Sequence, residues 1–314
     1  MASVKSNLRK MYAYKFFVSL SFVFGVLIPF FLEWGRISFF QIMVLQSWFV
    51  LWVMILEIPT GAIADYLGRK PTLTIAAILN AIGVLAYTSV PDFYVFMLGE
   101  FLWALALAMM SGTDEAMIYD SLKAVKKEKI SKKILGRFGS FEMLGIMAAA
   151  PIGSIIAATL GLRWTMLLMA VPFTIAFLIA LTLKEPARRK ARESGKYLKT
   201  LTNGIRYFYS HKILKILAFD GVSIAVLAFL IVWLFQSKLL QVEVGIAYFG
   251  IIVTAMTALE IAIMNNFGRL EKFAGSKKRY LLASALIPGI GFILLGLTPN
   301  AVFSMMLIIL IGGF

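Results

Sequence analysis

Long apolar stretches, each about as long as a bilayer is thick, recur along the whole chain. A helix needs about 20 apolar residues to cross roughly 30 Å of hydrocarbon, whereas the strands of membrane barrels alternate over about ten residues. The pattern therefore predicts an all-α membrane protein with about nine complete helices. They are expected at 14–33, 38–62, 71–90, 93–117, 134–158, 162–183, 213–236, 243–265 and 279–297, and a tenth begins near Ala301.

One long polar segment, 184–212, divides these helices into two sets. We expect an N-terminal six-helix half at 1–183, a basic cytoplasmic linker at 184–212, and an incomplete C-terminal half at 213–314 with helices seven to ten. Apolar residues of the linker recur at helical spacing, at Tyr197, Leu201, Ile205 and Phe208. With lysines and arginines between them, they predict an amphipathic helix on the membrane surface. Six helices, a linker and more helices indicate a duplicated plan.

Composition supports the membrane prediction and excludes several kinds of site. Of the 314 residues, 61% are hydrophobic, and the mean hydropathy is +0.87. The absence of cysteine excludes disulfides and zinc–thiolate sites, and a single histidine, His211, excludes the paired-histidine metal motif. No phosphate-binding loop is visible either. We therefore expect no enzyme activity, no cofactor and no metal.

Positive charge is concentrated on one side of the predicted helices. If successive loops alternate between the two sides, 28 of the 31 lysines and arginines fall on the side of the N-terminus, and only Arg36, Arg163 and Lys238 fall on the other. Cytoplasmic loops carry such an excess. The distribution predicts a multi-pass protein of the inner membrane with a cytoplasmic N-terminus. It also accounts for the net charge of +15 without a nucleic-acid partner.

The loop after the second predicted helix reads GAIADYLGRKP, from Gly61 to Pro71. It resembles the motif G-x-x-x-D-R/K-x-G-R-R/K of the major facilitator superfamily (MFS). Gly61 would let a neighbouring helix approach closely, and Gly68 would permit a tight turn. A weaker copy with the same glycine spacing follows the eighth helix, at 268–278.

The resemblance implies a role for this loop and an arrangement of twelve helices. In the family, the motif locks the cytoplasmic side shut in one conformation, and its arginine pairs with an acid at the inner end of helix four. Asp120 is placed to be that acid. The residues expected to form this conformational lock are Gly61, Asp65, Gly68, Arg69, Lys70 and Asp120. The aspartate of the motif would face helix eleven, so the chain is expected to be C-terminally incomplete.

Further segments are similar to the bacterial and archaeal drug-exporter-like branch of this family. APIG at Ala150–Gly153 and LGLRW at Leu160–Trp164 resemble the region of helices five and six in exporters. Small residues also recur every four positions along the fifth helix, from Gly145 to Gly161, which favours close helix packing. Antiporters of the family carry glycine before the proline, where this chain has Ala150. Tyr66 replaces the usual basic residue of the motif.

Acidic residues within the predicted helices are the candidates for a substrate or proton pathway, because each costs about 2.5–3.5 kcal/mol in hydrocarbon. Helical spacing places Glu100, Ser111 and Asp114 on one face, and Lys15 is interpreted as lying at a helix edge. The candidate residues are Asp114, Glu100, Glu57, Ser111, Glu115, Glu142, Asp220 and Glu260. The acids nearest the cytoplasmic side have a second interpretation, in which they simply reach water or loop lysines.

The function that the sequence favours is secondary transport by alternating access, with proton-coupled export of small cationic or amphipathic molecules. Uptake of a nutrient or lipid by the same fold is an alternative, as is a non-transporting membrane assembly or sensor protein. The expected partners are a small-molecule substrate, protons and the lipid bilayer. The protein is expected to be a monomer.

Overall fold

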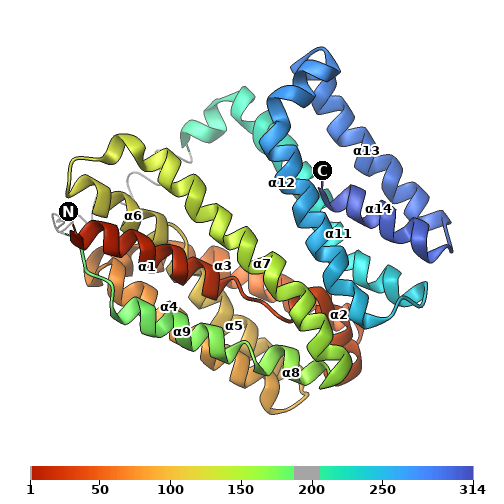
Figure 1. Cartoon of the computed structure of the whole chain (residues 1–314), viewed down its shortest axis with the longest axis horizontal. Coiled ribbons are helices and arrows are strands. Elements are labelled where there is room, and N and C mark those ends of the chain that lie inside the picture. The colour runs from red at the N-terminus through yellow and green to blue at the C-terminus, as the bar shows by residue number, and fades with distance from the viewer. Residues whose placement is uncertain (1, 187–205, 314) are drawn as a thin grey trace.

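The computed structural model describes residues 2–186 and 206–313, and within these ranges it contains helices and no strands. The linker residues Tyr197, Leu201 and Ile205 lie outside the described ranges, so the predicted amphipathic helix stays a prediction there. Figure 1 shows two groups of helices that meet at one end and diverge at the other.

The first group contains the helices up to residue 181 (Figure 1). Its helices are α1 (Ala2–Val18), α2 (Leu27–Pro29), α3 (Phe39–Leu67), α4 (Arg69–Ser89), α5 (Phe93–Met110), α6 (Thr113–Lys123), α7 (Ser131–Thr159), α8 (Leu162–Leu167) and α9 (Ala170–Leu181). Short segments lie beside them at η1 (Phe24–Val26), η2 (Phe30–Trp34) and η3 (Glu128–Ile130). Within this group, α4 packs against α5 and α9, and α1 packs against α7 and α9.

The second group contains the helices after the linker. Its members are α11 (Lys212–Gln241), η4 (Ile246–Tyr248), α12 (Phe249–Ala274), α13 (Lys277–Leu297) and α14 (Ala301–Gly313). Here α14 packs against α11, α12 and α13. The two groups meet chiefly where α7 crosses α12.

Seven helices of the described ranges are long and apolar enough to cross a membrane. Three further apolar stretches are shorter, at Phe24–Trp34, Phe229–Gln241 and Ala301–Gly313. The expected class, an all-helical membrane protein, is therefore confirmed, but the expected count of about nine complete spanning helices is not.

Local sequence accounts for where several helices begin. The Ser38 hydroxyl accepts a hydrogen bond from the Gln41 backbone amide, and the Gln41 side chain accepts one from the Ser38 amide, which forms a capping box for α3. Asp92 caps α5 by accepting from the amides of Tyr94 and Val95. Gly68 separates α3 from α4 at φ 121°, a backbone conformation that favours glycine.

Three of the predicted continuous helices are broken in the structure. The helix predicted at 162–183 is divided into α8 and α9 at residues 168–169. The helix predicted at 14–33 is α1 up to Val18, then an irregular stretch, then the short segments from Phe24 to Trp34. The helix predicted at 93–117 stops at Met110 and resumes at Thr113, because Gly112 takes a left-handed conformation at φ 68°. The sequence prediction missed these breaks because apolar residues continue through residues 168–169, and because the polar residues at the other two breaks, Ser19, Ser21 and Thr113–Glu115, were included in continuous helices.

Backbones approach very closely where the two groups of helices meet. A Cβ atom on Gly250 of α12 would collide with the carbonyl of Ala150 on α7, and the Gly250 amide donates to the Ser154 hydroxyl at 2.7 Å. Beside this contact, the Gln236 side chain of α11 accepts from the Ile28 amide and donates to the Phe24 carbonyl. These groups close one end of the molecule.

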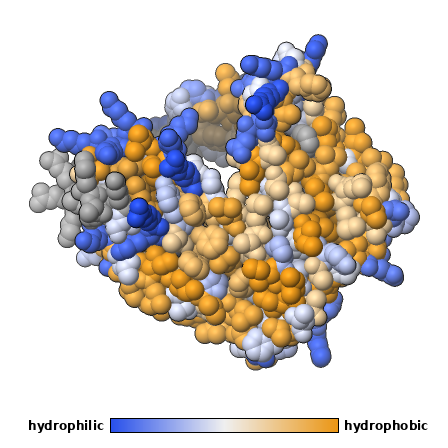
Figure 2. Space-filling model, viewed as in Figure 1, coloured by the Kyte–Doolittle hydropathy of each residue, from blue (hydrophilic) through white to orange (hydrophobic). Residues whose placement is uncertain are grey.

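The other end is open. Figure 2 shows a mostly hydrophobic surface whose hydrophilic side chains gather at the margins, with a hollow between the two groups of helices. The hollow lies next to the start of α7 and the end of α12, which adjoin the lysine- and arginine-rich segments 123–137 and 269–279. The molecule is therefore open toward the side that carries the basic loops.

The Gly250 contact leads to a prediction about stability. Gly250→Ala places a methyl group against the Ala150 carbonyl and should lower the free energy of unfolding by about 1–3 kcal/mol. The matched control is Gly268→Ala on the same helix, where an added Cβ meets no atom within 4 Å. Thermal unfolding midpoints in detergent measure both variants. Equal midpoints for the two would contradict the close packing of α7 on α12.

Candidate functional site

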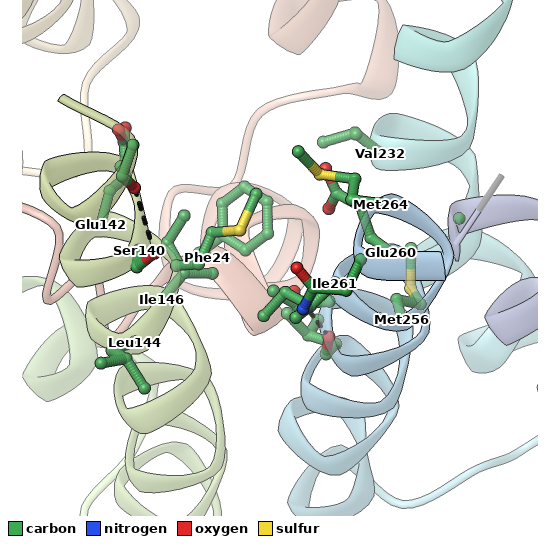
Figure 3. Close-up of a pocket in the computed structure, with 17 residues that line it drawn as sticks. Phe24, Ser140, Glu142, Leu144, Ile146, Val232, Met256, Glu260, Ile261 and Met264 are labelled. Atoms are coloured by element: carbon green, nitrogen blue, oxygen red, sulfur yellow. Dashed lines mark hydrogen bonds between the residues drawn. The ribbon is translucent and has the colours of Figure 1, made fainter. Parts of the chain in front are cut away.

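A cavity of about 830 Å³ lies between the first half of α7 and the middle of α12 (Figure 3). Its size is within the range of small-molecule sites. Apolar and methionine side chains form most of its wall, and polar groups are few. The lining residues are Phe24, Gly136, Gly139, Ser140, Glu142, Met143, Leu144, Ile146, Val232, Val253, Met256, Thr257, Glu260, Ile261, Met264, Asn265 and Gly312.

Carboxylates stand on opposite walls of this cavity. Glu142 belongs to α7 and Glu260 to α12, and Figure 3 shows them on the two sides of the space. Glu260 is half-buried, and its carboxylate makes no hydrogen bond or ion pair with any residue that the structure describes. The described residues that line the cavity include no lysine, arginine or histidine. The wall is thus apolar with a negative charge on each side.

Glu142 is linked to a second acid through Lys15 of α1. The Lys15 ammonium lies 3.1 Å from Glu142 Oε2 and 3.3 Å from Asp114 Oδ2 on α6. It also lies 5.2 Å from the centre of the Phe138 ring. The Asp114 side chain is 8% exposed and the Glu142 side chain 45%, so one acid is buried and the other faces the cavity. We call Lys15, Asp114 and Glu142 the ion triad.

The ion triad adds to one expectation from the sequence and corrects another. Lys15 lies in the last turn of α1, at a helix edge as expected, but its ammonium is enclosed between two acids. Asp114 does not share an exposed face with Ser111. The break at Gly112 turns α6 away from α5, so that Asp114 is buried while Ser111 is exposed.

Glu100 and Glu57 occupy separate places away from the cavity. Glu100 is 3% exposed and accepts a hydrogen bond from the Gln46 side chain at 2.8 Å, which joins α5 to α3. Glu57 is exposed on α3 and accepts from the Ser111 hydroxyl at 3.3 Å. Neither residue lines the cavity.

Two further predicted pathway residues lie outside the cavity lining. Glu115 follows Asp114 on α6 and is exposed, and its backbone amide donates to the Asp114 carboxylate at 2.7 Å. Asp220 belongs to α11, but its side chain is outside what the structure describes.

The loop between α3 and α4 forms a compact cluster of charges. Arg69 pairs with Asp65 at 3.0 Å and with Asp120 of α6 at 3.7 Å. The carboxylate of Glu185, just after α9, accepts from the backbone amides of Arg69 and Lys70 at 2.8 and 2.7 Å. These contacts join α3, α4, α6 and the segment after α9, and none of them reaches α11–α14.

The glycines of the α3–α4 loop motif and those of the small-residue face of α7 differ in how closely other backbones approach them. An added Cβ on Gly61 would meet open space, so the close helix contact expected there is wrong. The small-residue face of α7 does pack closely: a Cβ on Gly145 would lie 2.8 Å from the Phe16 carbonyl, and one on Gly153 would collide with the Phe22 carbonyl. Gly161, at the end of that face, instead makes a turn at φ 99°.

Sequence reasoning missed four residues of this region. No sequence signal pointed to Gln236, Gly250 or Glu185, because an isolated glutamine, glycine or glutamate in a helical or basic segment has many ordinary explanations. Lys15 did give a signal, since it is a lysine followed at once by apolar residues. Its meaning depended on acids 99 or more residues away, which one sequence does not connect to it.

The ion triad leads to a prediction about stability. Lys15→Gln leaves Asp114 as a buried carboxylate without its counter-charge, which should cost about 3 kcal/mol. The double variant Lys15→Gln/Asp114→Asn removes both charges and should recover most of that loss. Thermal unfolding of the two variants measures the difference. A double variant no more stable than the single one would show that the pair is not what holds α1 to α6.

Comparisons with known proteins identify the family. A family model described as Major Facilitator Superfamily matches residues 13–314. Among curated proteins, none matches the chain. Solved structures resemble it over nearly its whole length at low sequence identity, so each shows likeness of fold.

Three of these structures are transporters. A mutant of the nucleoside transporter NupG has a TM-score of 0.80 at 14% identity, and the match covers 99% of this chain and 79% of that one. A bacterial homologue of the human lysosomal transporter Spinster, inward-facing and unoccupied, has a TM-score of 0.77 at 17% identity, with 99% and 72% covered. A D-xylose–proton symporter has a TM-score of 0.58 at 13% identity, with 99% and 78% covered.

A membrane-spanning helical fold, a central cavity between two groups of helices, and a family match over residues 13–314 agree with one another. The chain belongs to the Major Facilitator Superfamily and is a multi-pass transporter of small molecules, not an enzyme.

Proposed function

We propose that the chain is a secondary transporter of small cationic, amphipathic molecules, and that the α7–α12 cavity is where the substrate binds. The observation that carries the proposal is the composition of the cavity wall: Glu142 and Glu260 stand on opposite sides of an otherwise mainly apolar space without a basic side chain among its described lining residues. A positively charged group is attracted to both walls. An apolar body fits the remaining surface.

The apolar part of the wall suits substrates of varied shape. Met143, Met256 and Met264 contribute flexible, polarisable side chains, which adapt to different contours more easily than branched ones do. Ser140, Thr257 and Asn265 add a few hydrogen-bonding groups. A polyhydroxylated substrate would find few partners here, whereas a hydrophobic cation would lose little on leaving water.

Coupling to protons follows from the same two acids. A carboxylate that faces a water-accessible cavity without a fixed counter-charge can carry either a proton or a cationic substrate, and the two compete. Glu260 meets that description, since no described residue pairs with it. Protonation of Glu260 on one side of the membrane and its exchange for substrate on the other would give antiport, and export if the basic loops are cytoplasmic.

Alternating access would move the two helical halves, 1–183 and 213–314, about the contact between α7 and α12. The cavity opens toward the basic loops in this conformation, and the Gly250–Ser154 contact closes the opposite end. We propose that the charge cluster formed by Asp65, Arg69 and Asp120, with Gly61, Gly68 and Lys70 of its loop, acts on the open side as the lock in the other conformation. The N-terminus would then be cytoplasmic.

Uptake of a polar nutrient is the second candidate function. The structures that resemble this chain include a nucleoside transporter and a D-xylose–proton symporter, and the same fold could run in that direction. The two candidates differ in the charge of the substrate, so one panel of ligands separates them.

The first prediction concerns ligand class. Purified protein should bind tetraphenylphosphonium, and Glu260→Gln should weaken that binding about tenfold, because one of the two attracting charges is lost. Triphenylphosphine oxide, a neutral compound of similar shape, serves as the charge control, and Glu57→Gln, which changes a carboxylate outside the cavity, is the protein control. Tight binding of a nucleoside or xylose, with none of the cation, would favour the uptake candidate.

The second prediction concerns coupling. The experiment uses sealed proteoliposomes with a pH dye inside. Tetraphenylphosphonium added outside should drive protons out of vesicles that hold the wild-type chain, and Glu260→Gln should abolish this proton flux. Substrate movement without proton movement would contradict antiport and indicate uniport. Proton and substrate moving in the same direction would indicate symport.

A further inference from the structure

We propose that Lys15 is a built-in competitor for the substrate: its ammonium occupies Glu142 in the empty cavity, and the positive group of an arriving substrate takes its place. The inference rests on the proposed function and adds a specificity-determining residue to it. Lys15 was not among the pathway residues that the sequence suggested.

The geometry places Lys15 between a permanent partner and an exchangeable one. Its ammonium lies 3.3 Å from Asp114 and 3.1 Å from Glu142, so it holds both carboxylates at once. Asp114 is buried at the back of the ion triad and also accepts from the Glu115 amide. Glu142 lines the cavity and is half-exposed, which leaves it within reach of a bound substrate.

A displaced Lys15 would still have a counter-charge. If a cationic substrate binds Glu142, the ammonium keeps Asp114 and is not left alone in a poorly solvated place. The exchange therefore avoids the several kcal/mol that an unpaired buried charge costs. With two acids and one lysine, the ion triad carries one net negative charge, and a monocation makes it neutral.

The backbone around Lys15 is fixed, so the exchange needs only side-chain movement. Gly145 of α7 lies against the Phe16 carbonyl and Ser19, and the Tyr14 hydroxyl donates to the Leu73 carbonyl of α4 at 3.0 Å. Tyr12 stacks on Phe141 with ring centres 5.0 Å apart. Lysine suits this role because its compact charge sits on a flexible four-carbon stem, whereas arginine would hold both acids in a rigid fork.

The consequence for specificity is that a substrate must carry a positive charge able to compete with an ammonium. A neutral molecule of the same shape leaves Lys15 on Glu142 and gains nothing from the acid. The Phe138 ring near Lys15 offers the ammonium a second favourable contact, which helps it stay in place when no substrate is bound.

The test uses a variant that removes the competing Lys15 ammonium and preserves the net charge of the ion triad. Lys15→Gln/Asp114→Asn removes one positive and one negative group, so the ion triad keeps its net charge of one, and the buried acid is removed together with its partner. Tetraphenylphosphonium should bind this variant about tenfold more tightly than wild type, because Glu142 no longer has an internal partner. Binding of triphenylphosphine oxide should not change.

Two further variants make the readout specific. Adding Glu142→Gln to the double variant should remove the gain, since the competition concerns that carboxylate. Lys10→Gln, the same substitution on the same helix but outside the cavity lining, should leave cation binding at its wild-type level. Size-exclusion profiles and thermal unfolding establish that each variant is folded.

The outcomes separate the two proposals. If wild type binds the cation and the double variant binds it equally or more weakly, Lys15 is not a competitor, and the proposed function stands. If the gain persists when Glu142 is replaced, the effect does not act through that acid, and the inference is overturned. If no folded variant and no wild-type protein binds the cation, the proposed function fails and the inference with it.

Discussion

A charge within the hydrocarbon region must meet a counter-charge, a strong hydrogen-bond donor or water, and this constraint organises the interior of the protein. The intramembrane acids that the structure describes satisfy it in different ways. Asp114 and Glu142 share Lys15, and Glu100 holds Gln46. Glu260 has neither kind of partner among the described residues and faces the cavity instead. Of the two acids that line the cavity, Glu260 is thus more available to ligands than Glu142.

A second constraint acts where the two groups of helices meet. The contact is made largely of backbone: Gly250 lies against the Ala150 carbonyl, and a Cβ atom on Gly25 would lie 3.5 Å from the Gly250 Cα. Packed backbones do not deform gradually, so such a contact favours two discrete arrangements over a continuous range. Ion pairs of Lys15 and Arg69 hold the first group together, and the smooth contact between groups is where movement is least obstructed. Transport by alternating access needs both properties.

The sequence predicted well what depends on composition and local order, and poorly what depends on distant contacts. Apolar length predicted the helical membrane class, and the small residues Gly145 and Gly153 predicted close packing on α7. Helix breaks were missed at 19–23 and at Gly112, because the prediction continued one helix through the polar residues Ser19, Ser21 and Thr113–Glu115. The prediction that Glu100, Ser111 and Asp114 share one helix face was wrong because the helix breaks at Gly112. The pairing of Lys15 with two acids was missed because those acids lie on helices made much later.

That separation along the chain has a consequence for biosynthesis. Lys15 leaves the ribosome 99 residues before Asp114, which at about 5–20 residues per second is roughly 5–20 s. During that time α1 carries a lysine without its partners, at a cost of about 2.5–3.5 kcal/mol if it sits at the bilayer centre. We therefore expect the first helix to reach its final depth only after α6 and α7 have been made.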